Sequence, residues 1–241
     1  MKLLRSLSVL LIVGLLFFSC SSDKKDSGTN QEEQPPQGVT IEPVQLPASM
    51  VQSSDEHAQL VVAYVNLLNV FQYWTNSLIP RGQVKKSPAL EATTDGPPWV
   101  YTWTEQGLTV TLTITIENNQ YHWVLTYSGS YEGTQYTNVK VVEAWQNMDG
   151  TSGSITLYDP ETQSKAADWT WQKDDQGTVT IHFISYDDQT EIILVQKADL
   201  SGSIEVKENS VLVFKATWNG DGTGQWWTYE NGSVSGSGTW G

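Results

Sequence analysis

The sequence has little cysteine, histidine or basic charge, and each shortage excludes a class of protein. One cysteine among 241 residues permits no intramolecular disulfide and no metal site built from cysteines. Three histidines leave few candidates for a histidine metal site or for acid–base catalysis. Lys and Arg number 13 against 27 Asp and Glu, for a net charge of -14. Because so acidic a chain repels phosphate backbones, we expect no nucleic acid among its partners.

The short motifs of the common enzyme classes are also missing. The chain has no His-Glu-x-x-His, no Gly-x-Ser-x-Gly, no phosphate-binding loop and no dinucleotide-binding glycine pattern. The acidic pairs at 174–175 and 187–188 fall between expected strands, where turn geometry favours Asp. We therefore expect a protein that is not an enzyme and holds no metal and no cofactor.

The longest apolar run lies near the N-terminus and is too short to cross a membrane. It extends over 12 residues, from Leu7 to Phe18, whereas a spanning helix needs about 20. Lys2 and Arg5 precede it and supply the positive charge typical of a secretory signal. Residues 1–19 are therefore predicted to be a signal peptide.

The run ends in a sequence that resembles the lipobox of bacterial lipoproteins. Ser19, a small residue, precedes Cys20, the single cysteine, although Phe17 and Phe18 differ from the Leu and small residue usual upstream. The resemblance implies that Cys20 becomes the first mature residue and carries the lipids. Ser21, rather than Asp, follows it. In Gram-negative lipoproteins this implies the outer membrane, where the protein faces the periplasm or the cell surface.

A linker and one helix are expected next. Residues 20–52 contain much Ser, Gln, Pro and Asp without periodicity, which predicts a flexible linker after the lipidated Cys20. Residues 53–56, Ser-Ser-Asp-Glu, are typical of an N-cap and an acidic first turn. Apolar residues then recur at helical spacing and leave only a narrow polar stripe, which predicts a long, largely buried helix over 53–79.

From residue 99 the apolar period changes to two. In Leu108–Glu117 apolar residues alternate with Thr, as in a strand with one buried face. About a dozen such runs follow, separated by short turns rich in Gly, Asn and Asp. Short turns join sequential antiparallel strands. We expect a mainly β fold, an antiparallel meander that forms a strongly curved sheet or a barrel. The helix packs on or in it, and residues 53–241 form one domain.

One internal echo raises the question of a repeat. The segment 152–155, Ser-Gly-Ser-Ile, recurs at 201–204, and Trp169 recurs as Trp218 at the same offset. No third copy lines up. The echo is compatible with a duplicated unit and with coincidence in a chain rich in Ser and Gly.

Aromatic composition is the most informative remaining feature. Eleven Trp and ten Tyr stand against five Phe. Trp and Tyr combine a flat apolar face with a polar group, which suits sugar stacking and interfaces, although these residues also fill cores. Trp226 and Trp227 are adjacent, so in a strand they point to opposite faces and at most one is free to bind.

Three functions follow as hypotheses. The first is a non-catalytic binder of a lipid or other apolar ligand between helix and curved sheet, by fold-level analogy with periplasmic lipoprotein carriers. The expected lining residues are Phe71, Trp74, Leu112, Ile114, Trp123 and Leu125. The second is a glycan- or protein-binding β module with exposed Trp or Tyr, and the third is a structural envelope lipoprotein. In each case we expect a monomer that contacts the membrane through its N-terminal lipid.

Overall fold

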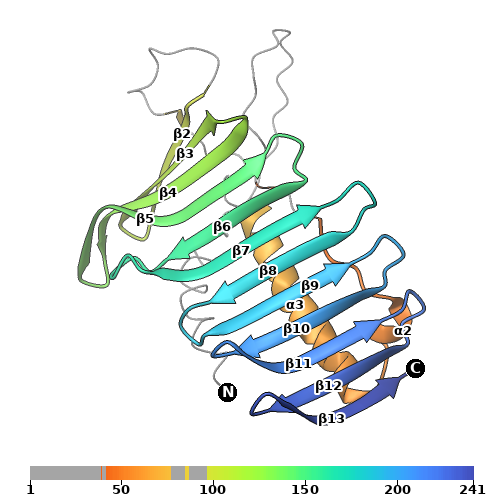
Figure 1. The fold of residues 1–241 in the computed structure, drawn as a ribbon. Coiled ribbons are helices and arrows are strands. Elements are labelled where there is room, and N and C mark those ends of the chain that lie inside the picture. The colour runs from red at the N-terminus through yellow and green to blue at the C-terminus, as the bar shows by residue number, and fades with distance from the viewer. Residues whose placement is uncertain (1–38, 40–41, 77–84, 87–96) are drawn as a thin grey trace.

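A single antiparallel sheet dominates the computed structural model, which describes residues 39, 42–76, 85–86 and 97–241 (Figure 1). The sheet has 13 strands, and each pairs with the next in sequence. The strands are β1 (Lys85–Lys86), β2 (Trp99–Glu105), β3 (Leu108–Glu117), β4 (Gln120–Tyr131), β5 (Thr134–Asn147), β6 (Ser152–Tyr158), β7 (Lys165–Lys173), β8 (Val179–Ser185), β9 (Thr190–Gln196), β10 (Gly202–Glu208), β11 (Val211–Trp218), β12 (Gly224–Glu230) and β13 (Ser233–Trp240). The expected meander is confirmed.

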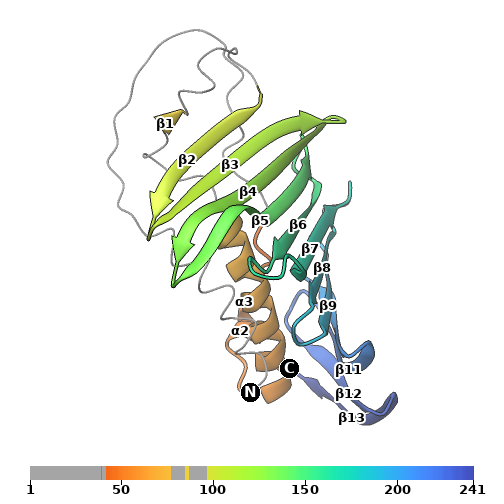
Figure 2. The same cartoon turned by 90° about the vertical axis from the view of Figure 1, so that its left-hand side faces the viewer.

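The sheet curves but does not close. Its strand order runs from β1 to β13 without pairing between the two ends. Figure 2 shows strands β2–β5 turned away from the later strands, with helix α3 (Glu56–Asn76) on the concave side. Of the two alternatives left open by the sequence, the barrel is therefore wrong. Since the helix covers the concave face, that face is shielded from water without closure of the sheet.

Strand alternation sorts the side chains onto two faces, as expected. In β3 the side chains of Leu108, Val110, Leu112 and Ile114 are 0–3% exposed, and the Thr residues between them lie on the opposite face. We call the apolar side, which α3 covers, the inner face and the other side the outer face. The same alternation continues through the register of the following strands.

Two helices are described in place of the single helix expected over residues 53–79. The first, α2, is the short segment Ala48–Val51. The second, α3, begins at Glu56 because Asp55 caps it: the Asp55 Oδ1 atom accepts hydrogen bonds from the backbone N–H of His57 at 2.9 Å and of Ala58 at 3.0 Å. The last three residues of the expected helix lie outside the described residues.

Helix α3 is fixed to the inner face by buried side chains from its first turn to Leu68. Its residues Ala58, Val61 and Leu68 are each 0% exposed. The His57 ring stacks on the Trp226 indole with centroids 3.5 Å apart and planes 3° from parallel. Burial of each large aliphatic side chain contributes about 1.5–3 kcal/mol, which makes α3 an integral part of the core.

The folded part of the chain starts earlier than expected. Val44 is 5% exposed, and its backbone N–H and C=O each bond to the Asn69 side chain at 3.0 Å. The Gln196 side chain bonds in the same two-sided way to the backbone of Gln45. The C-terminal boundary of the expected linker, residues 20–52, is thus wrong. Residues 42–52 lie against α3 and β9, held by side chains distant in sequence.

A recurring contact between glycine and tryptophan shows that the similar segments 152–155 and 201–204 belong to a structural repeat. In three pairs of adjacent strands an indole covers a glycine on the inner face so closely that a Cβ there would lie 2.2–2.5 Å from the nearest ring atom. The pairs are Gly153 with Trp171, Gly202 with Trp218, and Gly224 with Trp240. The counterpart of Trp218 is thus Trp171 and not Trp169, because Trp169 pairs with Ile155.

The turn before each glycine repeats as well. In each turn an Asp Oδ1 accepts hydrogen bonds at 2.6–2.9 Å from the N–H and hydroxyl of the residue two positions on. The indole Nε1 donates to the backbone carbonyl of the residue between the Asp and the Ser or Thr. Trp171 donates to Gly150 at 3.4 Å, Trp218 to Leu200 at 2.8 Å and Trp240 to Gly222 at 2.8 Å. A third copy therefore exists, contrary to the expectation from the sequence.

Candidate functional site

Four of the six residues predicted to line an apolar cavity meet on the inner face. Leu112 pairs with Leu125, and Ile114 pairs with Trp123, across β3 and β4. All four are 0–1% exposed, so none presents surface to a ligand in this structure. Phe71 lies on α3, as does Trp74, but their side chains lie outside the described residues. The described part of the predicted site is packed core.

Two buried polar atoms in this region have no hydrogen-bond partner. They are the Nε1 of Trp123 and the hydroxyl of Tyr127, both on the inner face of β4. Burial raises the pKa of the Tyr127 hydroxyl well above its usual value. Buried polar atoms are nearly always paired, so these two mark a place where an acceptor from a ligand or a water molecule is stabilising.

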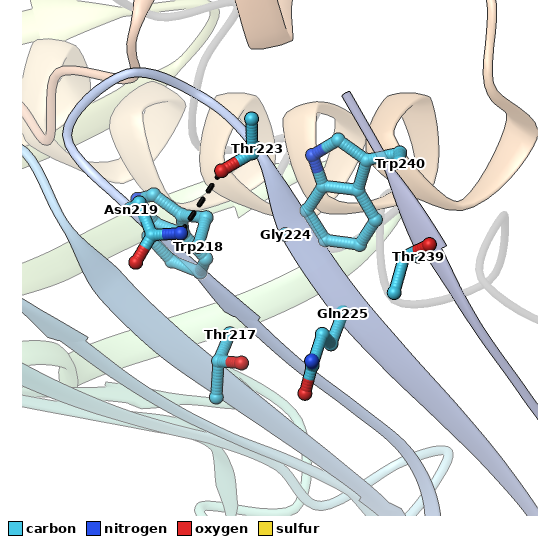
Figure 3. A pocket seen from close by; sticks show the side chains of 8 residues that line it. All are labelled: Thr217, Trp218, Asn219, Thr223, Gly224, Gln225, Thr239 and Trp240. Carbon is cyan, nitrogen blue, oxygen red and sulfur yellow. Dashed lines mark hydrogen bonds between the residues drawn. The ribbon is translucent and has the colours of Figure 1, made fainter.

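A pocket lies elsewhere, at the end of β11, β12 and β13, and sequence reasoning missed it. Its volume is about 400 Å³. Figure 3 shows the lining residues: Thr217, Trp218, Asn219, Thr223, Gly224, Gln225, Thr239 and Trp240. None of them was among the residues predicted to bind.

Strand register explains how these residues come together. Thr217 pairs with Gln225, which pairs with Thr239, so the three form one row across the outer face. The adjacent row toward the turn belongs to the inner face, where Trp218 and Trp240 flank Gly224, the glycine of the third repeat. The Asn219 amide donates to the Thr223 hydroxyl at 2.9 Å and holds the turn at the end of the row (Figure 3).

The polar groups of the pocket are uncharged. They are the hydroxyls of Thr217, Thr223 and Thr239 and the amides of Asn219 and Gln225. An amide offers both donors and acceptors, and a hydroxyl offers one donor and two lone pairs. Because no lining residue titrates near neutral pH, the pocket has no general acid or base. Its chemistry is hydrogen bonding to neutral polar groups.

An aromatic surface lies beside the pocket on the same face. Trp227 follows Gln225 by two residues in β12, and its cross-strand neighbours on the outer face are Lys215 and Ser237. Its side chain is half-buried, whereas Trp226 lies on the inner face against His57. The prediction that the two tryptophans point to opposite faces is confirmed, and Trp227 is the one on the outer face.

The other end of the outer face is charged and tightly bonded. The Glu143 carboxylate accepts hydrogen bonds from His122 at 3.0 Å, Lys140 at 2.7 Å and the Tyr158 hydroxyl at 2.9 Å. Burial raises the pKa of Glu143, but these three bonds outweigh it and lower the pKa to about 2. The His122 ring also stacks on Trp145 at 3.7 Å. Trp145 is thus engaged within the protein.

Asp168 and Glu191 repeat this arrangement along the same face. Asp168 accepts from Lys165 at 2.8 Å, and Glu191 from His182 at 2.7 Å. Burial raises the pKa of each carboxyl, but the hydrogen bonds that the carboxylate accepts lower the pKa by more. Both pKa values are therefore below their usual range. Carboxylates held ionised by several donors stabilise the sheet and are poor proton carriers at neutral pH.

Within the described ranges, no group of three or more His, Cys, Asp or Glu is placed to hold a metal ion. No helix in the same ranges is both long enough and apolar enough to cross a membrane. No family model and no curated protein matches this chain.

The pocket had one signal in the sequence. Its turn, residues 219–224, carries Asp followed after one residue by Thr and then Gly, and related triplets precede the glycine strands of the other two repeats. The recurrence of this turn marks three equivalent strand ends. It does not tell which end is open, because that depends on what packs against each one.

Proposed function

We propose that this chain is a non-catalytic binding protein of the cell envelope that recognises an uncharged glycan at the β11–β13 pocket. The observation that carries the proposal is a pocket lined by neutral hydroxyls and amides with Trp227 beside it. A sugar ring presents hydroxyls at its edge and a C–H surface on its face, which suit hydrogen-bonding side chains and an indole respectively. This favours the exposed-aromatic hypothesis over an apolar cavity.

Size and charge support the same ligand class. A pocket of about 400 Å³ lies within the range of ~300–1,000 Å³ typical of small-molecule sites. The chain as a whole carries a net charge of -14, which disfavours acidic polymers at its surface. A neutral oligosaccharide suits a pocket of this size and carries no negative charge for the protein to repel.

Binding is tested with a panel of neutral oligosaccharides, with an acidic polysaccharide as comparison, by calorimetry on the full chain in detergent. Gln225→Ala and Trp227→Ala are expected to weaken binding of the selected neutral glycan about tenfold each, because one removes hydrogen bonds and the other a stacking surface. Trp145→Ala is the matched control, since it removes an outer-face indole far along the sheet. Equal loss in all three variants, or binding of no neutral glycan, contradicts the proposal.

The membrane anchor is part of the proposal and rests on residues outside the described ones. The basic start, the apolar run and the cysteine that follows Ser19 support lipidation of Cys20 and attachment to the outer membrane. Cys20→Ala is expected to move the protein from the membrane fraction to the soluble envelope fraction. Retention of this variant in the membrane contradicts lipid anchoring.

One observation supports the apolar-ligand hypothesis: the Nε1 of Trp123, in the predicted site, has no hydrogen-bond partner. A matching ligand is mostly apolar and has one hydrogen-bond acceptor, as a lipid ester does. Native mass spectrometry of the full chain, followed by solvent extraction, tests it directly. A stoichiometric lipid in excess of the covalent anchor supports this second function, and its absence rejects it.

A further inference from the structure

The last strand of the sheet has an unpaired edge. Within the described residues, β13 pairs with β12 and with no strand on its other side. A register shift lies where Thr228 and Tyr229 face β13, and beyond it residues 236–240 pair regularly. Alternate backbone N–H and C=O groups of this regular stretch therefore point away from β12, where another strand can bond to them.

The usual protections of a sheet edge are missing here. Natural edges carry Lys, Pro or inward charges that prevent pairing with another chain. The opposite edge, β1, consists of two lysines. By contrast, β13 has the sequence SVSGSGTW, with neither charge nor proline, and the side chains of Ser237 and Thr239 are exposed. Among the residues that the structure describes, no strand pairs with this edge, so an additional strand can bond to it.

The charge distribution favours a second copy of this chain at the β13 edge. Two chains with a net charge of -14 repel each other over most of their surface. Residues 222–241, however, contain a single charged side chain, that of Glu230. Two copies thus meet with least repulsion at β13.

The pattern of the inner face supplies a register. Along the strand ends, glycine and tryptophan alternate from β10 to β13: Gly202, Trp218, Gly224 and Trp240. Glycine is next in this series. An antiparallel pairing centred on Gly238 sets Trp240 opposite Gly236 of the second copy, and two-fold symmetry does the same in reverse.

We propose that two copies of this chain join through antiparallel pairing of residues 236–240 of β13, so that their sheets form one continuous sheet. On the outer face this register sets Ser237 opposite Thr239 of the second copy. Thr239 lines the pocket, so each pocket lies beside a residue of the other chain. Two pockets on one continuous surface then give bivalent binding of a polymer, a consequence that rests on the proposed function.

Charge variants at the two opposed outer-face positions test both the dimer and its register. The full chain in detergent is analysed by native mass spectrometry over a wide dilution series, without any ligand. Wild type is expected to be a dimer at micromolar concentration. The variant S237K/T239K sets Lys opposite Lys twice, so its dimer affinity is expected to fall about tenfold or more. In S237K/T239E each Lys faces a Glu, so this variant is expected to remain dimeric.

A mixture of S237K/T239K with S237E/T239E is expected to form heterodimers, which excludes misfolding as the reason for the monomers. A wild-type monomer at all concentrations overturns the proposal, as does a dimer that all charge variants retain. Equal loss of the dimer in S237K/T239E and S237K/T239K overturns the register. Because no readout involves glycan, failure of the dimer and failure of glycan recognition are distinguishable.

Discussion

The inner and outer faces of the sheet are built by the same strands but use their aromatic residues in opposite ways. On the inner face Trp171, Trp218 and Trp240 each cover a glycine and donate a hydrogen bond to a turn carbonyl. On the outer face Trp227 lies beside an open pocket. The comparison shows that the number of tryptophans says little about binding, because the three inner-face indoles are held by contacts within the fold.

The largest effect is expected where an inner-face indole is removed. Trp218→Ala leaves a cavity on Gly202 and an unbonded carbonyl at Leu200, so unfolding in urea is expected to show a loss of about 3–5 kcal/mol. Trp227→Ala on the outer face is the control, with an expected loss below about 1 kcal/mol. Similar losses for both variants contradict the division of roles between the faces.

Part of this division follows from the sequence alone. The alternation of apolar residues with Thr predicted the bounds Leu108–Glu117, which are those of β3, and adjacency placed Trp226 and Trp227 on opposite faces. Both results depend on the two-residue period of a strand, which is a local property. The segment 53–56 contains the N-cap, which is also a local feature, although the cap is Asp55 and the helix begins at Glu56 rather than at residue 53.

The features that sequence reasoning missed depend on distant contacts. Residues 42–46 look like linker because their partners, Asn69 and Gln196, lie far along the chain. The counterpart of Trp218 is misplaced by two residues because the register between β6 and β7 selects Trp171. The pocket escaped because Thr, Asn and Gln at a turn are typical of any solvated surface. Whether a sheet closes is likewise decided by what packs on its concave side.

A second prediction sharpens the repeat on the inner face. A Cβ at residue 202 would lie 2.4 Å from the Val195 carbonyl oxygen and 2.5 Å from the Trp218 ring. Gly202→Ala is therefore expected to displace the indole and to cost about 1–3 kcal/mol in urea unfolding, with reduced near-ultraviolet circular dichroism. The matched control is Gly133→Ala, where φ is +87° and nothing lies within 4 Å, so only backbone strain of about 1 kcal/mol is added. An unchanged tryptophan signal in Gly202→Ala contradicts the assigned contact.

A third prediction concerns the charged part of the outer face. The pKa of Glu143 is about 2 in the fold against about 4.5 in the unfolded chain. A carboxyl with a depressed pKa stabilises the fold above its unfolded pKa, and this contribution disappears as the pH falls from about 4.5 toward 2. Glu143→Gln is expected to lose about 1–2 kcal/mol at pH 7 and little at the acid end. Urea titrations of both proteins across this range measure the difference, and a loss independent of pH contradicts the role of the charge.

The smallest effect is expected for an isolated ion pair near the pocket. Lys215 contacts Glu205 at 2.9 Å, and both side chains are about 36% exposed. Such pairs contribute little because water screens them and two flexible side chains must be ordered, so Lys215→Met is expected to change unfolding by less than about 0.5 kcal/mol. Glycan affinity is also expected to remain, since Lys215 lies next to Trp227 without lining the pocket. Recognition of an acidic ligand predicts the opposite: binding that depends on Lys215 and declines steeply with salt. Calorimetry of Lys215→Met at two salt concentrations therefore separates a neutral ligand from an acidic one.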